Sequence, residues 1–221
     1  MSPDRWLAWL ARLAGVLCWP FVRFDIDGGG ELNRSLGPVV LATDHRSLFD
    51  VVAGLIVFHR YQRYPRVLIE RSFVESRWTG AFARAIGAIP VDRASHGGAA
   101  LASAVDALRS GVTVLLLPEG RLHWDPADPL STGPAATGVS RMAAEAEVPV
   151  VAAGMVGTES VWPAGTQFPR LRPLRRALVV VRVADAPVAF RHEDDHRQRT
   201  EQVMEEVRAL MAQASLAAST A

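Results

Sequence analysis

Residues 38–52, PVVLATDHRSLFDVV, set the architecture expected for this chain, because two periodicities meet within them. The first five residues are an apolar, β-branched run, which is typical of a buried strand. Residues 47–60 then follow a helical pattern that opens with a serine and has a carboxylate three residues later, as in a capping box. The stretch therefore predicts a strand, a tight turn and a helix, which is a building block of α/β proteins.

The same alternation repeats along the rest of the chain. Continuous apolar runs separated by helical patterns are typical of a parallel sheet with helices on both faces. The predicted strands span residues 38–42, 66–70, 88–91, 112–117, 148–154 and 177–183. The predicted helices lie near residues 4–18, 47–60, 73–85, 96–110, 135–147 and 193–214. We therefore expect an α/β fold with a central, mostly parallel sheet flanked by helices.

Length and composition indicate a globular protein with one domain. The 221 residues suffice for one well-formed core, and we expect a single domain over residues 25–221. A net charge of +1 gives no general attraction to nucleic acid, which is not an expected partner. All 24 basic residues are arginines, a bias that weakens any argument from an arginine cluster alone. The single cysteine, Cys18, excludes an internal disulfide and fits a reducing compartment.

The N-terminal segment, residues 1–24, has its own prediction. Arg12 interrupts its apolar pattern, and the uncharged run that follows is shorter than the roughly 20 residues needed to span a bilayer. Trp6, Trp9 and Trp19 suit a membrane interface, where the ring is buried while the N–H stays hydrated. We predict an amphipathic helix at the membrane surface and a peripheral location on the cytoplasmic face of the cell membrane. A terminal helix packed on the domain is the alternative.

Polar clusters follow three of the predicted strands, at residues 44–50, 92–93 and 118–121. Ligands of such sheets bind beyond the carboxyl ends of the strands, so we expect the clusters to form one site. Capping explains Ser47 and Asp50 but leaves His45 unexplained.

An imidazole that donates one nitrogen to a carboxylate can remove a proton from a hydroxyl with the other. The His45 and Asp50 pair is therefore open to two interpretations, as a catalytic base with its orienting acid or as part of a helix start.

Four motifs, in order, resemble the glycerolipid acyltransferase family, and most closely its bacterial 1-acylglycerol-3-phosphate acyltransferases. They are DHRSLFD (44–50), GAIPVDR (87–93), LPEGR (117–121) and EVPVVAAGMVGTE (147–159), and the match extends over residues 38–162. The resemblance implies that His45 is the general base and Asp50 its orienting partner. The acceptor hydroxyl then attacks the thioester of acyl-CoA or acyl-carrier protein directly. The acyl carrier is a co-substrate, and no metal or bound cofactor is expected.

The resemblance also implies a binding site for a lysophospholipid, 1-acylglycerol 3-phosphate, whose acylation gives phosphatidic acid. Arg93 matches the phosphate-binding arginine, for which a planar guanidinium suits two oxygens. Glu119 and Gly120 match the motif that helps to hold the acceptor. Arg121 and Ser47 complete the predicted substrate-binding set.

Three departures from the family pattern leave the acceptor open. Asp44 stands where the family usually has Asn or Ser, and it would either act electrostatically on His45 or cap the turn. Arg121 follows Gly120 directly, without the usual Thr, so it either reaches the phosphate from a shifted start or points elsewhere. Thr137-Gly138 replaces a usual Lys-Gly. The alternatives are an acyltransferase with a non-phosphate acceptor, such as a glycolipid or secondary metabolite, and a non-catalytic lipid-binding relative.

Two further segments have weaker interpretations. Residues 192–196 have the HExxH spacing of a zinc site, but the acidic residues within it favour the solvated first turn of the last helix. Residues 158–176 form a long connection rich in proline and arginine, which predicts a lid or a surface-binding loop. Its arginines either attract anionic lipid or acyl-carrier protein, or form a solvated basic loop.

Overall fold

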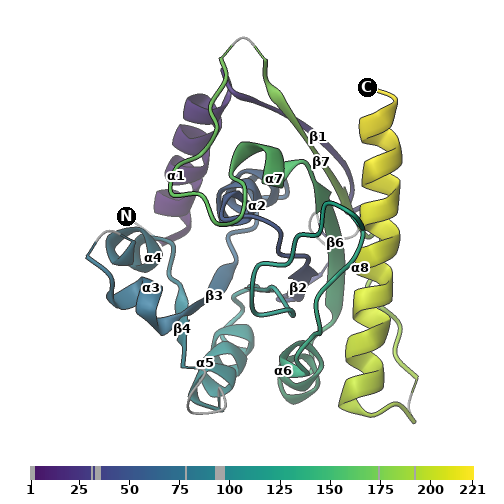
Figure 1. Cartoon of the computed structure of the whole chain (residues 1–221). Coiled ribbons are helices and arrows are strands. Elements are labelled where there is room, and N and C mark those ends of the chain that lie inside the picture. The colour runs from purple at the N-terminus through teal and green to yellow at the C-terminus, as the bar shows by residue number, and fades with distance from the viewer. Residues whose placement is uncertain are drawn as a thin grey trace.

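A single mixed sheet organises the part of the chain that the structure describes (Figure 1). The structure is a computed structural model and describes residues 3–30, 32, 36–77, 79–92, 98–173, 175–191 and 193–221. Within these residues, seven strands lie in the order β1-β7-β6-β2-β5-β3-β4, and all neighbours are parallel except β6 and β7. The strands are β1 (Val22–Gly28), β2 (Val40–Thr43), β3 (Arg66–Glu70), β4 (Ile89–Val91), β5 (Val114–Leu116), β6 (Val150–Val156) and β7 (Ala177–Val183).

Helices cover both faces of this sheet, which confirms the predicted fold class (Figure 1). α5, α6 and α8 pack in a row over one face, and α8 lies along β6 and β7. α2 covers the other face, with α1 and α7 packed against it. The helices are α1 (Pro3–Cys18), α2 (Phe49–Arg60), α3 (Arg71–Glu75), α4 (Gly80–Ala85), α5 (Gly98–Arg109), α6 (Gly138–Ala146), α7 (Thr158–Val161) and α8 (His196–Ser219).

All six predicted strands are present, but β1 was not predicted. β1 lies at an edge of the sheet, where β7 is its one partner among the described strands, and charged residues alternate along it. Strands were predicted from continuous apolar runs, which are typical of strands buried on both faces. An edge strand with one partly solvated face does not produce such a run, so β1 escapes this criterion.

One helix prediction needs correction, and the bounds of the N-terminal helix are confirmed. The helix predicted for residues 73–85 is divided into α3 and α4, because Ser76 adopts an extended conformation (φ −61°, ψ 139°) between them. The N-terminal helix, predicted near residues 4–18 of the 1–24 segment, is α1, which ends at Cys18, and the segment then enters β1 at Val22. Within the described ranges, no helix is both long enough and apolar enough to cross a membrane.

The packing of α8 on β6 depends on a glycine. Val203, Val207, Leu210 and Met211 of α8 are buried, as their helical spacing predicts. A Cβ atom at Gly154 of β6 would lie 2.4 Å from the backbone nitrogen of Met211, which is closer than packed atoms allow. The missing side chain at position 154 therefore lets the helix backbone approach the strand.

The acidic residues within the HExxH spacing, residues 193–195, lie just before α8, whereas the sequence predicted them in its first turn. Asp195 caps the helix, and its carboxylate accepts hydrogen bonds of 2.8 Å from the backbone N–H groups of Arg197 and Gln198. His196 is the first helical residue, and His192 lies outside the described residues.

Candidate active site

The 44–50 turn, which joins β2 to α2, brings His45 and Asp50 together. One carboxylate oxygen of Asp50, Oδ2, lies 3.0 Å from the ring nitrogen Nδ1 of His45. The same oxygen accepts hydrogen bonds of 2.8 Å from the backbone N–H groups of Arg46 and Ser47. A single buried oxygen therefore holds both the backbone of the turn and the imidazole, so the two interpretations of this pair are compatible.

Ser47 takes part in this turn through different contacts from those of a full capping box. Its hydroxyl accepts a hydrogen bond from the N–H of Phe49 at 3.0 Å, whereas a capping box would use the N–H of Asp50. The hydroxyl also donates to the carbonyl oxygen of Trp162 at 2.7 Å, and the residue is fully buried. In this structure the Ser47 hydroxyl is therefore enclosed by protein groups, and the substrate-binding role expected for it stays a prediction.

His45 is the more accessible member of the pair. Its side chain is 17% exposed, whereas that of Asp50 is 1% exposed. When Nδ1 carries the proton and donates to an ionised Asp50, the other ring nitrogen, Nε2, is left as an acceptor. Within the described part of the chain, no protein group is hydrogen-bonded to Nε2. This is the geometry that a general base requires.

Asp44, which departs from the family pattern, holds the turn without a hydrogen bond to the His45 ring. Its carboxylate accepts hydrogen bonds from the backbone N–H of Met155 at 2.9 Å and from the Arg46 guanidinium at 2.9 Å. Burial raises the pKa of Asp44 to about 7, although the positive charge of Arg46 acts in the opposite direction. Of the two roles that the sequence left open, the hydrogen bonds are those of a residue that secures the turn.

The 119–133 segment, which follows β5 without regular structure, lies against the 44–50 turn. The Glu119 carboxylate accepts hydrogen bonds from the N–H of His45 at 3.2 Å and from the N–H of Gly133 at 2.7 Å. The N–H of His123 donates to the carbonyl oxygen of His45 at 2.7 Å. Burial raises the pKa of Glu119. The backbone of His45 is therefore held on both sides by this segment.

A cleft of about 450 Å³ opens beside this segment, at the carboxyl ends of β3, β4 and β5. Glu119, Gly120 and Arg121 form one wall, and the first turn of α6 forms another. Gly120 adopts a φ of 65°, the left-handed conformation that glycine tolerates best. His45 is not itself among the lining residues, but its N–H is bonded to Glu119, which is.

Two arginines make the cleft a candidate site for an anion. Arg121 and Arg141 both line it and are exposed, and among the described residues neither guanidinium has a hydrogen bond or ion pair. Arg141 was not predicted as a site residue. Its sequence signal is its place in the first turn of α6, three residues after Gly138. Helix starts of this kind, at the carboxyl end of a parallel sheet, commonly face a ligand.

Arg93, the predicted phosphate-binding arginine, lies outside the described residues. Val91, two residues before Arg93 in the sequence, lines the cleft. Among the residues that the structure does describe, no three His, Cys, Asp or Glu side chains are placed to hold a metal ion.

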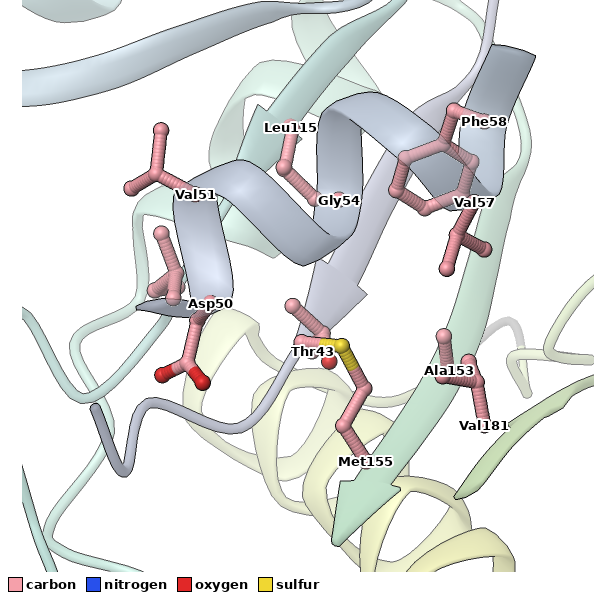
Figure 2. Close-up of a pocket in the computed structure, with 11 residues that line it drawn as sticks. Thr43, Asp50, Val51, Gly54, Val57, Phe58, Leu115, Ala153, Met155 and Val181 are labelled. Carbon is pink, nitrogen blue, oxygen red and sulfur yellow. The ribbon is translucent and has the colours of Figure 1, made fainter. Parts of the chain in front are cut away.

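A second, much smaller cavity lies under α2 (Figure 2). Apart from Thr43 and Asp50, it is lined by apolar residues of α2 and of the strands beneath, including Val57, Phe58 and Met155. Its volume of about 10 Å³ is at the lower limit for one water molecule. A lipid-sized substrate therefore fits the 450 Å³ cleft better than this cavity.

Comparisons with known proteins identify the family and the fold. A model of the Acyltransferase family matches residues 26–156. The chain is 27% identical over 161 residues to the chloroplastic 1-acyl-sn-glycerol-3-phosphate acyltransferase BAT2 of Brassica napus. This match covers 72% of the chain but only 44% of the plant protein, so the chain spans less than half of that relative's length.

The fold is similar to the crystal structure of the 1-acyl-sn-glycerophosphate (LPA) acyltransferase PlsC from Thermotoga maritima. The TM-score is 0.71 at 18% identity, over 93% of this chain and 80% of that protein. At this identity the likeness establishes a shared fold.

Proposed function

The chain belongs to the Acyltransferase family, and from this premise we propose that it transfers an acyl group to the free hydroxyl of 1-acylglycerol 3-phosphate, giving phosphatidic acid. The observation that carries the proposal is the contact between His45 and Asp50. Oδ2 of Asp50 lies 3.0 Å from Nδ1 of His45, and the same oxygen accepts hydrogen bonds from the backbone of the turn. The names of the plant and bacterial relatives support the choice of acceptor.

In the proposed reaction, Nε2 of His45 removes the proton of the acceptor hydroxyl as its oxygen attacks the thioester carbonyl. The carbon–sulfur bond then breaks, and the thiolate of CoA or acyl-carrier protein leaves and takes up a proton. Asp50 keeps the imidazole in the tautomer that accepts at Nε2 and stabilises the imidazolium. The thioester is already activated, so the reaction needs no metal or bound cofactor and depends on proximity and proton removal.

The decisive experiment is an acyl-transfer assay of the purified chain with radiolabelled acyl-CoA and acyl-carrier protein. The acceptors are lysophosphatidic acid, other lysophospholipids, monoacylglycerol and a glycolipid, with products separated on thin-layer plates. We expect lysophosphatidic acid to be the preferred acceptor. Preference for the glycolipid would indicate the non-phosphate alternative. Lipid binding without transfer would indicate a non-catalytic relative.

Arg121 and Arg141 are proposed to bind the acceptor phosphate within the cleft. A charge-assisted hydrogen bond contributes about 1.5–3 kcal/mol. Replacing either residue by glutamine should therefore raise the KM for lysophosphatidic acid about 10- to 100-fold, with a smaller effect on kcat. Exposed Arg191, which does not line the cleft, is the control, and Arg191→Gln should leave KM unchanged. An unchanged KM in both cleft variants would remove these arginines from the binding site.

We also propose that α1 contacts the membrane, as a peripheral attachment on the cytoplasmic face. Leu7 and Ala11 are buried, so one side of α1 packs on the domain, while Val16, Leu17 and Trp19 are 70%, 62% and 68% exposed. Packing of α1 on the domain and its proposed contact with the membrane are therefore compatible. The single Cys18 fits a reducing compartment.

The connection after α7 ends against Trp19, which directly follows α1, and adds to this apolar surface. Arg176 stacks over the ring of Trp19 at 5.2 Å and donates a hydrogen bond to the carbonyl oxygen of Val22. Phe168 is 72% exposed, and Arg170 and Arg172 are exposed beside it. This pattern suits a bilayer with anionic lipids.

The variant Val16→Glu/Leu17→Glu tests this attachment. Each apolar side chain withdrawn from the bilayer loses about 1.5–3 kcal/mol, so vesicle binding should fall by about tenfold or more. Co-sedimentation with vesicles containing phosphatidylglycerol measures the effect. Leu216→Glu is the matched control, because Leu216 is 70% exposed on α8, which covers the opposite face of the sheet. Equal binding by both variants would show that α1 does not contact the membrane.

A further inference from the structure

Arg46, which follows His45, is a charged side chain buried in the protein with no role in the reaction described above. Only 2% of its surface is exposed. A buried charge destabilises the fold unless it is paired and hydrogen-bonded, so the contacts of Arg46 indicate what it does in the structure. The guanidinium donates to Asp44 through Nε and to the carbonyl oxygen of Pro129 through Nη2, and it lies 5.1 Å from the centre of the Trp124 ring.

These contacts connect two separate parts of the chain. Asp44 belongs to the 44–50 turn, whereas Trp124 and Pro129 belong to the 119–133 segment. The segment has no regular structure to fix its path, so its position depends on such contacts. Arg46 spans both parts because its planar guanidinium offers several donors in fixed directions and an apolar face for stacking.

The position of this segment bears directly on His45. The N–H of His45 donates to Glu119, and its carbonyl oxygen accepts from the N–H of His123 at 2.7 Å. The backbone that presents the imidazole is therefore clamped by the same segment that Arg46 fastens. A shift of the segment would change the direction in which the ring points, even with Asp50 unchanged.

Arg46 also balances buried negative charge around the turn. Its positive charge lowers the pKa of Asp44 and of Glu159, in opposition to the burial that raises both. Removing the guanidinium would leave these carboxyl groups without that compensation.

We propose that Arg46 is a positioning residue that fastens the 119–133 segment to the 44–50 turn and thereby holds His45 in its reactive orientation. The kinetic part of its test rests on the proposed function, whereas the structural part does not.

The test compares Arg46→Met with Arg63→Met. Arg63 is also partly buried and donates to the carbonyl oxygens of Leu32 and Gly37, but it lies in the connection from α2 to β3, away from the cleft. A misplaced catalytic group can cost about 10²-fold in rate, so Arg46→Met should lower kcat at least about tenfold with KM nearly unchanged. Arg63→Met should lower the unfolding midpoint and leave kcat within about twofold.

Amide hydrogen exchange followed by NMR provides a readout that needs no substrate. Exchange at the N–H groups of His45 and His123 should accelerate about tenfold or more in Arg46→Met and stay unchanged in Arg63→Met. Unchanged exchange and kcat in Arg46→Met would overturn the proposal. So would an equal loss of kcat in both variants, which would show a general loss of stability. A wild-type chain without acyl transfer would refute the proposed function and leave the exchange result to decide this inference.

Arg46→Lys and Trp124→Leu keep the proposal testable if Arg46→Met does not fold. The lysine retains the charge but cannot reach both Asp44 and Pro129 with one compact ammonium group. The leucine removes only the stacking contact. Each should lower kcat by about threefold or more and accelerate exchange at His123. Wild-type values of both quantities in the two variants would overturn the proposal.

Discussion

His45→Ala is expected to reduce acyl transfer about 10²- to 10⁴-fold, which is the contribution of a general base in a positioned site. The free energy of unfolding should fall by only about 1 kcal/mol, because the variant loses one hydrogen bond to Asp50 while the backbone bonds of the turn remain. Initial rates with lysophosphatidic acid and a urea titration measure the two effects.

The matched control is His59→Ala. His59 lies on α2 and has a comparable hydrogen bond, of 2.9 Å, between its ring nitrogen Nδ1 and the Tyr64 hydroxyl. Burial, with the charge of Arg12, lowers its pKa. It does not line the cleft, so the control should keep its activity. Turnover by His45→Ala at the wild-type rate would exclude His45 as the base.

Asp50→Asn is expected to reduce kcat about 10²- to 10⁴-fold with little change in KM, because an amide cannot enforce the same tautomer of His45. It should also destabilise the fold by about 1–3 kcal/mol. Oδ2 of Asp50 accepts three hydrogen bonds, and its side chain is 1% exposed. If the NH₂ group of asparagine took the place of this oxygen, it would face buried N–H donors and no acceptor. Steady-state kinetics and thermal unfolding measure the two effects.

Asp195→Asn is the control for an isosteric change at a helix start. Its carboxylate also accepts two backbone N–H bonds, but at the start of α8, and it does not line the cleft. Asparagine is as good an N-cap as aspartate, so stability and activity should both be close to wild type. Full activity of Asp50→Asn would show that the carboxylate only secures the 44–50 turn and does not orient His45.

The contact between His45 and Asp50 was predictable because it is local. Both residues lie within one turn between a strand and a helix, so the sequence alone limits how far apart they can be. The strands were predictable for a related reason, since burial on both faces requires a continuous apolar run. β1 shows the limit of this rule, because an edge strand carries no such run.

The contacts of the 119–133 segment were not predictable from the sequence. Glu119 matches a family motif, but nothing in the sequence indicates that its carboxylate bonds to the N–H groups of His45 and Gly133. Ser47 matches a capping residue, but its bond to the carbonyl oxygen of Trp162 depends on where α7 packs. Each of these partners is brought in by packing from a distant part of the chain.

The sequence alone therefore determined the class of fold, the order of its main elements and the pairing of His45 with Asp50, because apolar periodicity and the reach of a short turn are local properties. Only the tertiary structure decided that Arg141 lines the cleft with Arg121, that Ser47 is buried, and that Arg46 bonds to a distant segment that lies beside His45. These contacts arise where loops from separate strands meet at one edge of the sheet, and the path of an irregular loop is set by what it packs against.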